Sequence, residues 1–228
     1  MAEEYRRAAH FNTLLVFLVV LYTAVPFLPG WVAVLGLPRI AIELALVTAV
    51  WRLRVGRVVP VLVTVVMLVN EITHAVAFTS PSPAIAMLRA VWILIFLAVA
   101  IGFLAWFFWR EERVGPGFLS GAVSLYLLLG FFWASSFKLI EFVEPGSFRG
   151  ICAPRPTGVT DCDLAIGQYP RLDYLGFVTM TTLGYGDIVP LTRRAERLTT
   201  ISAVTGQLFI AVLIGRIVAN SRPPRRED

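Results

Sequence analysis

The residues with the most evident chemistry form one short run, Thr181-Thr182-Leu183-Gly184-Tyr185-Gly186-Asp187. Gly184 and Gly186 stand at alternate positions, and glycine adopts backbone angles that other residues avoid. A chain with such freedom can turn its carbonyl oxygens toward a cation and replace the water around it. The other interpretation is a Gly-Tyr-Gly turn in an ordinary loop, and those three residues alone are a weak signal. The segments on either side therefore decide what the run does.

Few residues are suited to other kinds of chemistry. His10 and His74 are the only histidines, and they lie in different apolar segments. No H-E-x-x-H or G-x-S-x-G motif occurs, so two common enzyme signatures are missing. The absence of a C-x-x-C pair or a histidine-rich cluster argues against a structural metal site. We therefore expect a protein that is not an enzyme and needs no cofactor.

The composition is that of an integral membrane protein. Of the 228 residues, 57% are hydrophobic and 15% are charged, and the mean hydropathy is +0.76, too apolar for a soluble domain of this size. The net charge of +5 is modest, and membrane topology explains its arginines better than nucleic-acid binding does. An all-α membrane protein with six transmembrane helices is expected from the apolar runs at about 11–28, 31–51, 57–79, 84–109, 117–143 and 191–219.

Arginine placement predicts how these helices are oriented. Basic residues precede the first run and follow the second, fourth and last, whereas the short breaks at 29–30 and 80–83 carry no charge. Cytoplasmic loops are the ones enriched in arginine. We therefore expect a multi-pass plasma-membrane protein with both termini in the cytoplasm and residues 144–190 outside. The first run is long and has no small-residue cleavage site, so we interpret it as a retained helix.

Residues 174–181 are apolar but too short to cross a bilayer. They predict a re-entrant half-helix between the fifth and sixth spans, with Pro170 near its start. In this setting, Thr182 to Asp187 resembles the T-V-G-Y-G-D selectivity filter of potassium channels, with Leu183 in place of valine. Over roughly 115–220 the chain is similar to prokaryotic-type potassium channels of the tetrameric pore-loop superfamily.

The resemblance implies potassium-selective conduction across the lipid bilayer through a homotetramer. It implies that Tyr174, Thr181 and Asp187 support the filter, although family members often have tryptophan where Tyr174 stands. Many also have glutamate at the place of Val178. The filter residues that the resemblance assigns to ion binding are Thr182, Leu183, Gly184, Tyr185 and Gly186, with K⁺ held at the first four.

The last run contains Gly206, about twenty residues after the filter. In related channels a glycine near this place acts as a gating hinge. The alternative is close packing between membrane helices, which also favours small residues. Glycine costs about 1 kcal/mol in a helix interior relative to alanine, so either role has to offset that cost.

Cys152 and Cys162 lie in the outer polar stretch. An oxidising exterior favours a disulfide between them, and two free thiols are the alternative.

A six-helix chain with its pore in the last two helices resembles the voltage-gated layout, but the arginine ladder is missing. Residues 84–109 contain only Arg89. A voltage sensor needs several such charges, because each contributes about 2.3 kcal/mol per 100 mV. We therefore expect no steep voltage gating.

The leading helices nevertheless contain ionisable residues, which are costly inside a membrane and are usually paired. We expect an ion-pair network of Arg39 and Arg89 with Glu43 and Glu71. The alternative is a proton or ligand sensor that uses Glu71 and His74.

These features predict three parts, namely a four-helix membrane domain at 1–114, a pore domain at 115–220 and a short cytoplasmic tail at 221–228. A potassium-uptake transporter subunit and a weakly selective cation channel are the competing functions. Transporters of that kind carry four degenerate pore loops in one longer chain, and relaxed filters tend to lose the Tyr-Gly half.

Overall fold

The computed structural model describes residues 2–24, 27, 37–52, 58–79, 82–110, 116–152, 169 and 171–220. These residues are almost entirely helical. The elements in chain order are α1 (Ala2–Ala24), α3 (Leu37–Arg52), α4 (Val58–Thr79), α5 (Pro83–Arg110), α6 (Pro116–Val143), β1 (Phe148–Arg149), α7 (Arg171–Met180), β2 (Val189–Pro190) and α8 (Arg193–Asn220).

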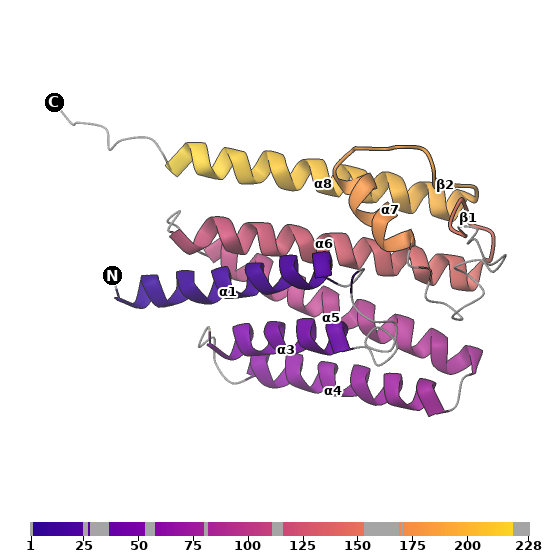
Figure 1. Ribbon diagram of the computed structural model, residues 1–228. Coiled ribbons are helices and arrows are strands. Elements are labelled where there is room, and N and C mark those ends of the chain that lie inside the picture. The colour runs from indigo at the N-terminus through magenta and orange to yellow at the C-terminus, as the bar shows by residue number, and fades with distance from the viewer. Residues whose placement is uncertain are drawn as a thin grey trace.

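The long helices run side by side along one direction, and α7 lies across the space between α6 and α8 (Figure 1). The start of α1 and the end of α8 lie at one end of this bundle, while β1 and β2 lie at the other (Figure 1). Phe148 pairs with Pro190 and Arg149 with Val189 in a short antiparallel ladder.

Four helices among the described residues are long and apolar enough to cross a membrane, namely α4 over Val58–Val76, α5 over Pro83–Arg110, α6 over Gly117–Val143 and α8 over Arg193–Ala219. This confirms the predicted all-helical membrane protein. The apolar stretch described within α1 is shorter, Phe11–Val20, and α3 has 16 residues. The predicted total of six spans therefore remains a prediction.

Local sequence explains where several helices begin. Ser82 accepts a hydrogen bond from the Ile85 backbone N–H, 3.3 Å, and Pro83 is the first residue of α5. Proline suits this position because its fixed φ matches the helix and its missing N–H would be unpaired there. α8 is capped in the same way, since Thr192 Oγ1 accepts from the Ala195 backbone N–H at 3.4 Å.

One continuous apolar core joins the predicted N-terminal domain to the predicted pore domain. Leu18 of α1, Leu46 of α3 and Phe96 of α5 are buried in the same cluster as Leu128 of α6. Helix α6 also packs against α7 and α8. It is therefore the element that carries the short helix α7 and connects the segment after it with the rest of the bundle.

Candidate functional site

Helix α7 is held against α6 at a close approach of two backbones. A Cβ added at Gly176 would lie 3.0 Å from both the Gly130 carbonyl oxygen and the Ala134 Cβ. The Phe177 ring lies directly over Gly130, where an added Cβ would be 2.3 Å from it. Leu172 is completely buried at the other end of the same contact. With ten residues, about 15 Å of helix, α7 is too short to cross a bilayer.

The chain leaves α7 through Thr182, whose backbone has a left-handed conformation. The Thr182 N–H donates to the Thr179 carbonyl at 3.1 Å and the Leu183 N–H donates to the Val178 carbonyl at 3.0 Å. This pair of bonds is the Schellman pattern of helix C-termini. Thr182 has φ 57°, where glycine is usual and a β-branched residue is strained by about 1–2 kcal/mol. The helix thus ends on a residue that also begins the predicted filter.

Left-handed angles recur at every second residue of this run. Thr182, Gly184 and Gly186 have φ 57°, 53° and 76°, whereas Leu183 and Tyr185 between them do not have positive φ. Regular helices and strands have negative φ at every residue, so this run has neither backbone. All residues from 181 to 187 are exposed in the single chain. Such a backbone can offer a row of oxygen ligands to a dehydrated cation.

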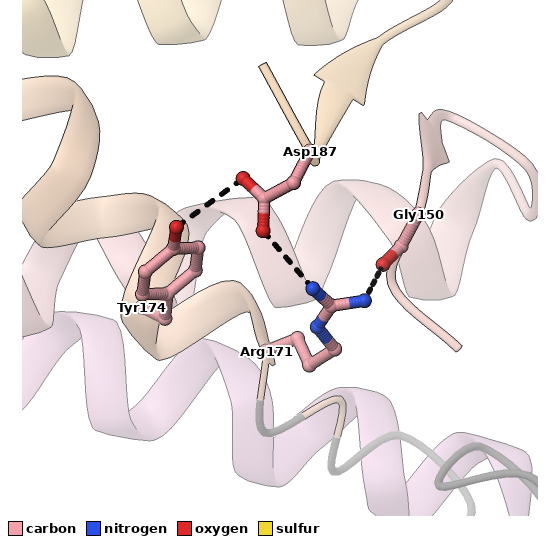
Figure 2. A network of polar contacts seen from close by, with 4 residues as sticks. All are labelled: Gly150, Arg171, Tyr174 and Asp187. Atoms are coloured by element: carbon pink, nitrogen blue, oxygen red, sulfur yellow. Dashed lines mark hydrogen bonds and ion pairs between the residues drawn. The ribbon is translucent and has the colours of Figure 1, made fainter. Parts of the chain in front are cut away.

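The outer end of the run is fixed through the Asp187 carboxylate, as Figure 2 shows. Tyr174 Oη donates to Asp187 Oδ1 at 3.2 Å. Arg171 Nη2 donates to Asp187 Oδ2 at 3.0 Å, and Arg171 Nη1 donates to the Gly150 carbonyl. The sequence analysis places Tyr174 and Asp187 among the residues expected to support the filter but does not single out Arg171. The sequence does contain one signal for Arg171, which is its spacing. Arg171 lies three residues before Tyr174, and residues three apart share a helix face.

Tyr174 also contacts Tyr185, a residue of the predicted filter. Its ring is stacked on that of Tyr185, with the centroids 6.3 Å apart and the planes within 4°. Desolvation, and after it the negative charge of Asp187, raises the pKa of Tyr174. The phenol therefore remains protonated at neutral pH and stays a hydrogen-bond donor.

Backbone contacts hold Asp187 as well. Gly150 has φ 87°, and a Cβ added there would lie 2.1 Å from the Asp187 carbonyl oxygen. The residues just before Gly150 form β1, which pairs with β2 directly after the run. Glu141 is buried at the end of α6 and accepts the N–H groups of Gly146, 2.7 Å, and Phe148, 3.0 Å. The outer end of the run is thus built into a turn that α6 anchors.

The inner end of the run rests on α8 and α6. A Cβ added at Gly206 would lie 2.3 Å from the Met180 carbonyl oxygen and 3.0 Å from Met180 C and Cα. The same oxygen accepts a hydrogen bond from Tyr126 Oη at 3.3 Å, and the Tyr126 ring lies against Phe209. Of the two interpretations of Gly206, this contact favours close packing over a hinge.

Glu43, a member of the predicted charge network, binds a neutral side chain that the prediction did not include. Glu43 and Asn70 are buried, and Asn70 Nδ2 donates to Glu43 Oε1 at 2.6 Å, joining α3 to α4. Glu71 and His74 on α4 and Arg89 on α5 are half-buried. The side chain of Arg39 lies outside the described residues. The network as a whole remains a prediction.

Cys152 is disulfide-bonded. Cys162, its predicted partner, lies outside the described residues, so the pairing also remains a prediction.

The class of protein to which this site corresponds follows from comparison with known families. Residues 170–220, which contain α7, the run with alternating φ and α8, match the profile of a family described as "Ion channel". This match agrees with the expectation of a protein that is not an enzyme.

The chain is also similar to two-pore potassium channel 4 of Arabidopsis thaliana, with 43% identity over 47 residues. The similar region makes up 21% of this chain and 16% of that protein. No solved structure shows a significant match to the chain.

Proposed function

We propose that this chain is one subunit of a potassium-selective channel. The observation that carries the proposal is the alternation of φ at Thr182, Gly184 and Gly186, within a segment that matches an ion channel family. The similarity to a plant potassium channel supports potassium as the ion. The backbone carbonyls of residues 182–185 take the place of the water around K⁺ as it passes.

The ends of α7 suit this role. Its last turn directs the negative end of the helix dipole toward the inner end of the filter, where a cation is favoured. Thr182 Oγ1 donates to the Thr181 carbonyl at 2.7 Å, so the hydroxyl oxygen keeps its lone pairs for an ion. Asp173, in the first turn of α7, lies at the positive end of the dipole.

The functional unit is a homotetramer. One chain contributes one filter, whose residues 181–187 are all exposed. Irregular backbone at membrane depth is tolerated only where it faces protein or a water-filled pore, and four such loops surround the ion in potassium filters. The apolar side chains that α8 exposes provide the surface for neighbouring copies and lipid, and they include Ile201, Val204, Leu208, Val212 and Val218. Cyclic symmetry closes the ring.

In this proposal six helices of each chain span the plasma membrane, α7 is re-entrant, and both termini are cytoplasmic. The end of α8 and the start of α1 at one end of the bundle fit this orientation (Figure 1). The β1–β2 ladder then faces outside, where a Cys152–Cys162 bridge is stable. Arg89 alone does not make a voltage sensor.

The test is reconstitution of the full chain in liposomes and measurement of reversal potentials under K⁺ and Na⁺ gradients. Gly184→Ala is the matched variant, because its Cβ meets nothing within 4 Å in the chain while φ is +53°. Its effect is therefore conformational strain rather than a clash. We expect strong K⁺ selectivity in the wild type and its loss in Gly184→Ala.

Other outcomes identify the competing functions. Equal permeability to K⁺ and Na⁺ means a weakly selective cation channel, and saturable flux without single-channel openings means a transporter. A conducting species that is strictly monomeric or dimeric overturns the tetramer.

A further inference from the structure

We infer that Arg171 is a positioning residue that keeps the outer end of the filter in its conducting shape and so sets how long an open channel conducts. This inference rests on the proposed function. It starts from one side chain that bridges two segments, since one nitrogen of its guanidinium binds Asp187 and another binds the Gly150 carbonyl (Figure 2).

The bridge connects the filter to elements that cannot move with it. Arg171 is the first residue of α7, and the adjacent Leu172 is fully buried. Gly150 follows β1, whose turn is anchored on the buried carboxylate of Glu141. The Asp187 carboxylate is thus tied at once to the start of α7 and to the strand beside the filter.

Arginine is suited to this bridge for a geometric reason. Its guanidinium is planar and holds its donors in a fixed fork, whereas a lysine ammonium is a single point charge on a flexible stem. The two acceptors bound by Arg171 belong to separate segments, so the fork fixes their relative position as well as neutralising Asp187. A lysine can keep the attraction to Asp187 but not the orientation.

The part of the filter nearest to Asp187 is the part with the greatest backbone freedom. Gly186 and Gly184 have positive φ, and a Cβ added at either would meet nothing within 4 Å in the chain. Glycine exchanges readily between positive and negative φ. Without the bridge to Asp187, the Tyr185 and Gly186 carbonyls can therefore rotate away from the ion path.

The bridge is a local restraint rather than a source of global stability. The side chains of Arg171 and Asp187 are 30% and 39% exposed, and ion pairs exposed to this degree contribute little to folding. A change at Arg171 should therefore alter the filter while the protein remains folded.

The chain supplies a matched control at the same end of α7. Lys138 Nζ lies 2.7 Å from Asp173 Oδ1, and these side chains are 24% and 36% exposed. This second ion pair also joins α7 to a neighbouring element, and within the described part of the chain the polar bonds of Lys138 and Asp173 are to each other rather than to the filter run. Lys138→Gln removes one ion pair at α7 and leaves the bridge between Arg171 and Asp187 in place.

The experiment compares Arg171→Gln, Arg171→Lys, Asp187→Asn, the Arg171→Gln/Asp187→Asn double variant and Lys138→Gln in planar bilayers. The readout is the mean duration of conduction during sustained opening, and reversal potentials are recorded in the same bilayers. We expect Arg171→Gln and Asp187→Asn each to shorten that duration at least threefold. Arg171→Lys should recover part of the loss, the double variant should be no worse than either single variant, and Lys138→Gln should match the wild type.

A readout that needs no current separates this inference from the proposed function. In folded, gel-filtered protein, the backbone amides of residues 183–190 should exchange hydrogen at least threefold faster in Arg171→Gln than in Lys138→Gln. The inference is wrong if Arg171→Gln conducts for as long as the wild type or longer, or if its amide hydrogens exchange at the wild-type rate. It is also wrong if Lys138→Gln has an effect equal to that of Arg171→Gln. Absence of K⁺ selectivity in the wild type instead overturns the proposed function. In that case the exchange measurement still tests whether the bridge restrains residues 183–190.

Discussion

Replacement of Gly206 by alanine tests how α8 meets the inner end of the filter. The new Cβ would lie 2.3 Å from the Met180 carbonyl oxygen, whereas ordinary contacts begin at 3.4 Å. The obstacle is backbone, which cannot rotate aside as a flexible side chain can. The last residue of α7 and the filter that follows it must therefore move away from α8, or α8 must bend.

The size of the effect follows from two opposing terms. Overpacking of this kind costs about 1–3 kcal/mol, and the higher helix propensity of alanine returns about 1 kcal/mol. The net loss of stability is then roughly 0–2 kcal/mol. The displacement matters more than the energy, because restoring an ordinary contact requires a shift of about 1 Å at a residue adjoining the filter.

The assay combines thermal unfolding of the detergent-solubilised protein with reversal potentials and open probability in bilayers. We expect Gly206→Ala to lower both the unfolding temperature and the K⁺/Na⁺ permeability ratio. Gly215→Ala is the control in the same helix, because its Cβ meets nothing within 4 Å in the chain; it should preserve the permeability ratio and raise the unfolding temperature through the higher helix propensity of alanine. If Gly206→Ala changes open probability while selectivity and unfolding temperature remain those of the wild type, Gly206 is a hinge and the packing argument is wrong.

Three further changes have defined outcomes. Tyr174→Phe removes the bond to Asp187 but keeps the stacked ring, so single-channel records should show shorter conduction than wild type but longer than Arg171→Gln. Because the pKa of Tyr174 is raised from 10.0, its bond is present at neutral pH and is lost as the pH rises through the raised value, where the phenolate is repelled by Asp187 and the wild type should lose its advantage over Tyr174→Phe. Glu141→Leu leaves the buried Phe148 N–H and the Gly146 N–H without their acceptor and should lower the free energy of unfolding by about 1–3 kcal/mol in denaturant titrations. Asn70→Ala removes a donor from the buried carboxylate of Glu43 and should destabilise by a similar amount, about 1–3 kcal/mol, in thermal melts, whereas an unchanged melting temperature would contradict a structural role for this pair.

The sequence indicates the backbone conformation of two residues in the proposed filter because that signal is local. Gly184 and Gly186 adopt the left-handed angles that only glycine takes without strain. Thr182 does the same without being glycine, and nothing in its residue type indicates this. The apolar runs likewise predict the long helices, since length and hydropathy are properties of one segment.

The start of α7 shows where local reasoning stops. The sequence predicts an apolar helix from 174 to 181, yet α7 runs from Arg171 to Met180. Pro170 places the start of the helix correctly, but the sequence does not indicate which partners its first residues have. In the structure Arg171 pairs with Asp187 and Asp173 pairs with Lys138. A single sequence does not reveal pairs separated by so many residues.

The two ends of the proposed filter are held by different kinds of contact, and we expect this difference to have a functional consequence. At the outer end, a half-exposed ion pair at Asp187 contributes about 0–1 kcal/mol, so its loss leaves the fold intact and affects how long the filter keeps its shape. At the inner end, the Met180 backbone lies against Gly206 with no room for one methyl group, so even a small change there moves the helix that carries the filter. Substitutions at the outer end should therefore alter the duration of conduction in a selective, folded channel, whereas substitutions at the inner end should lower selectivity and stability together.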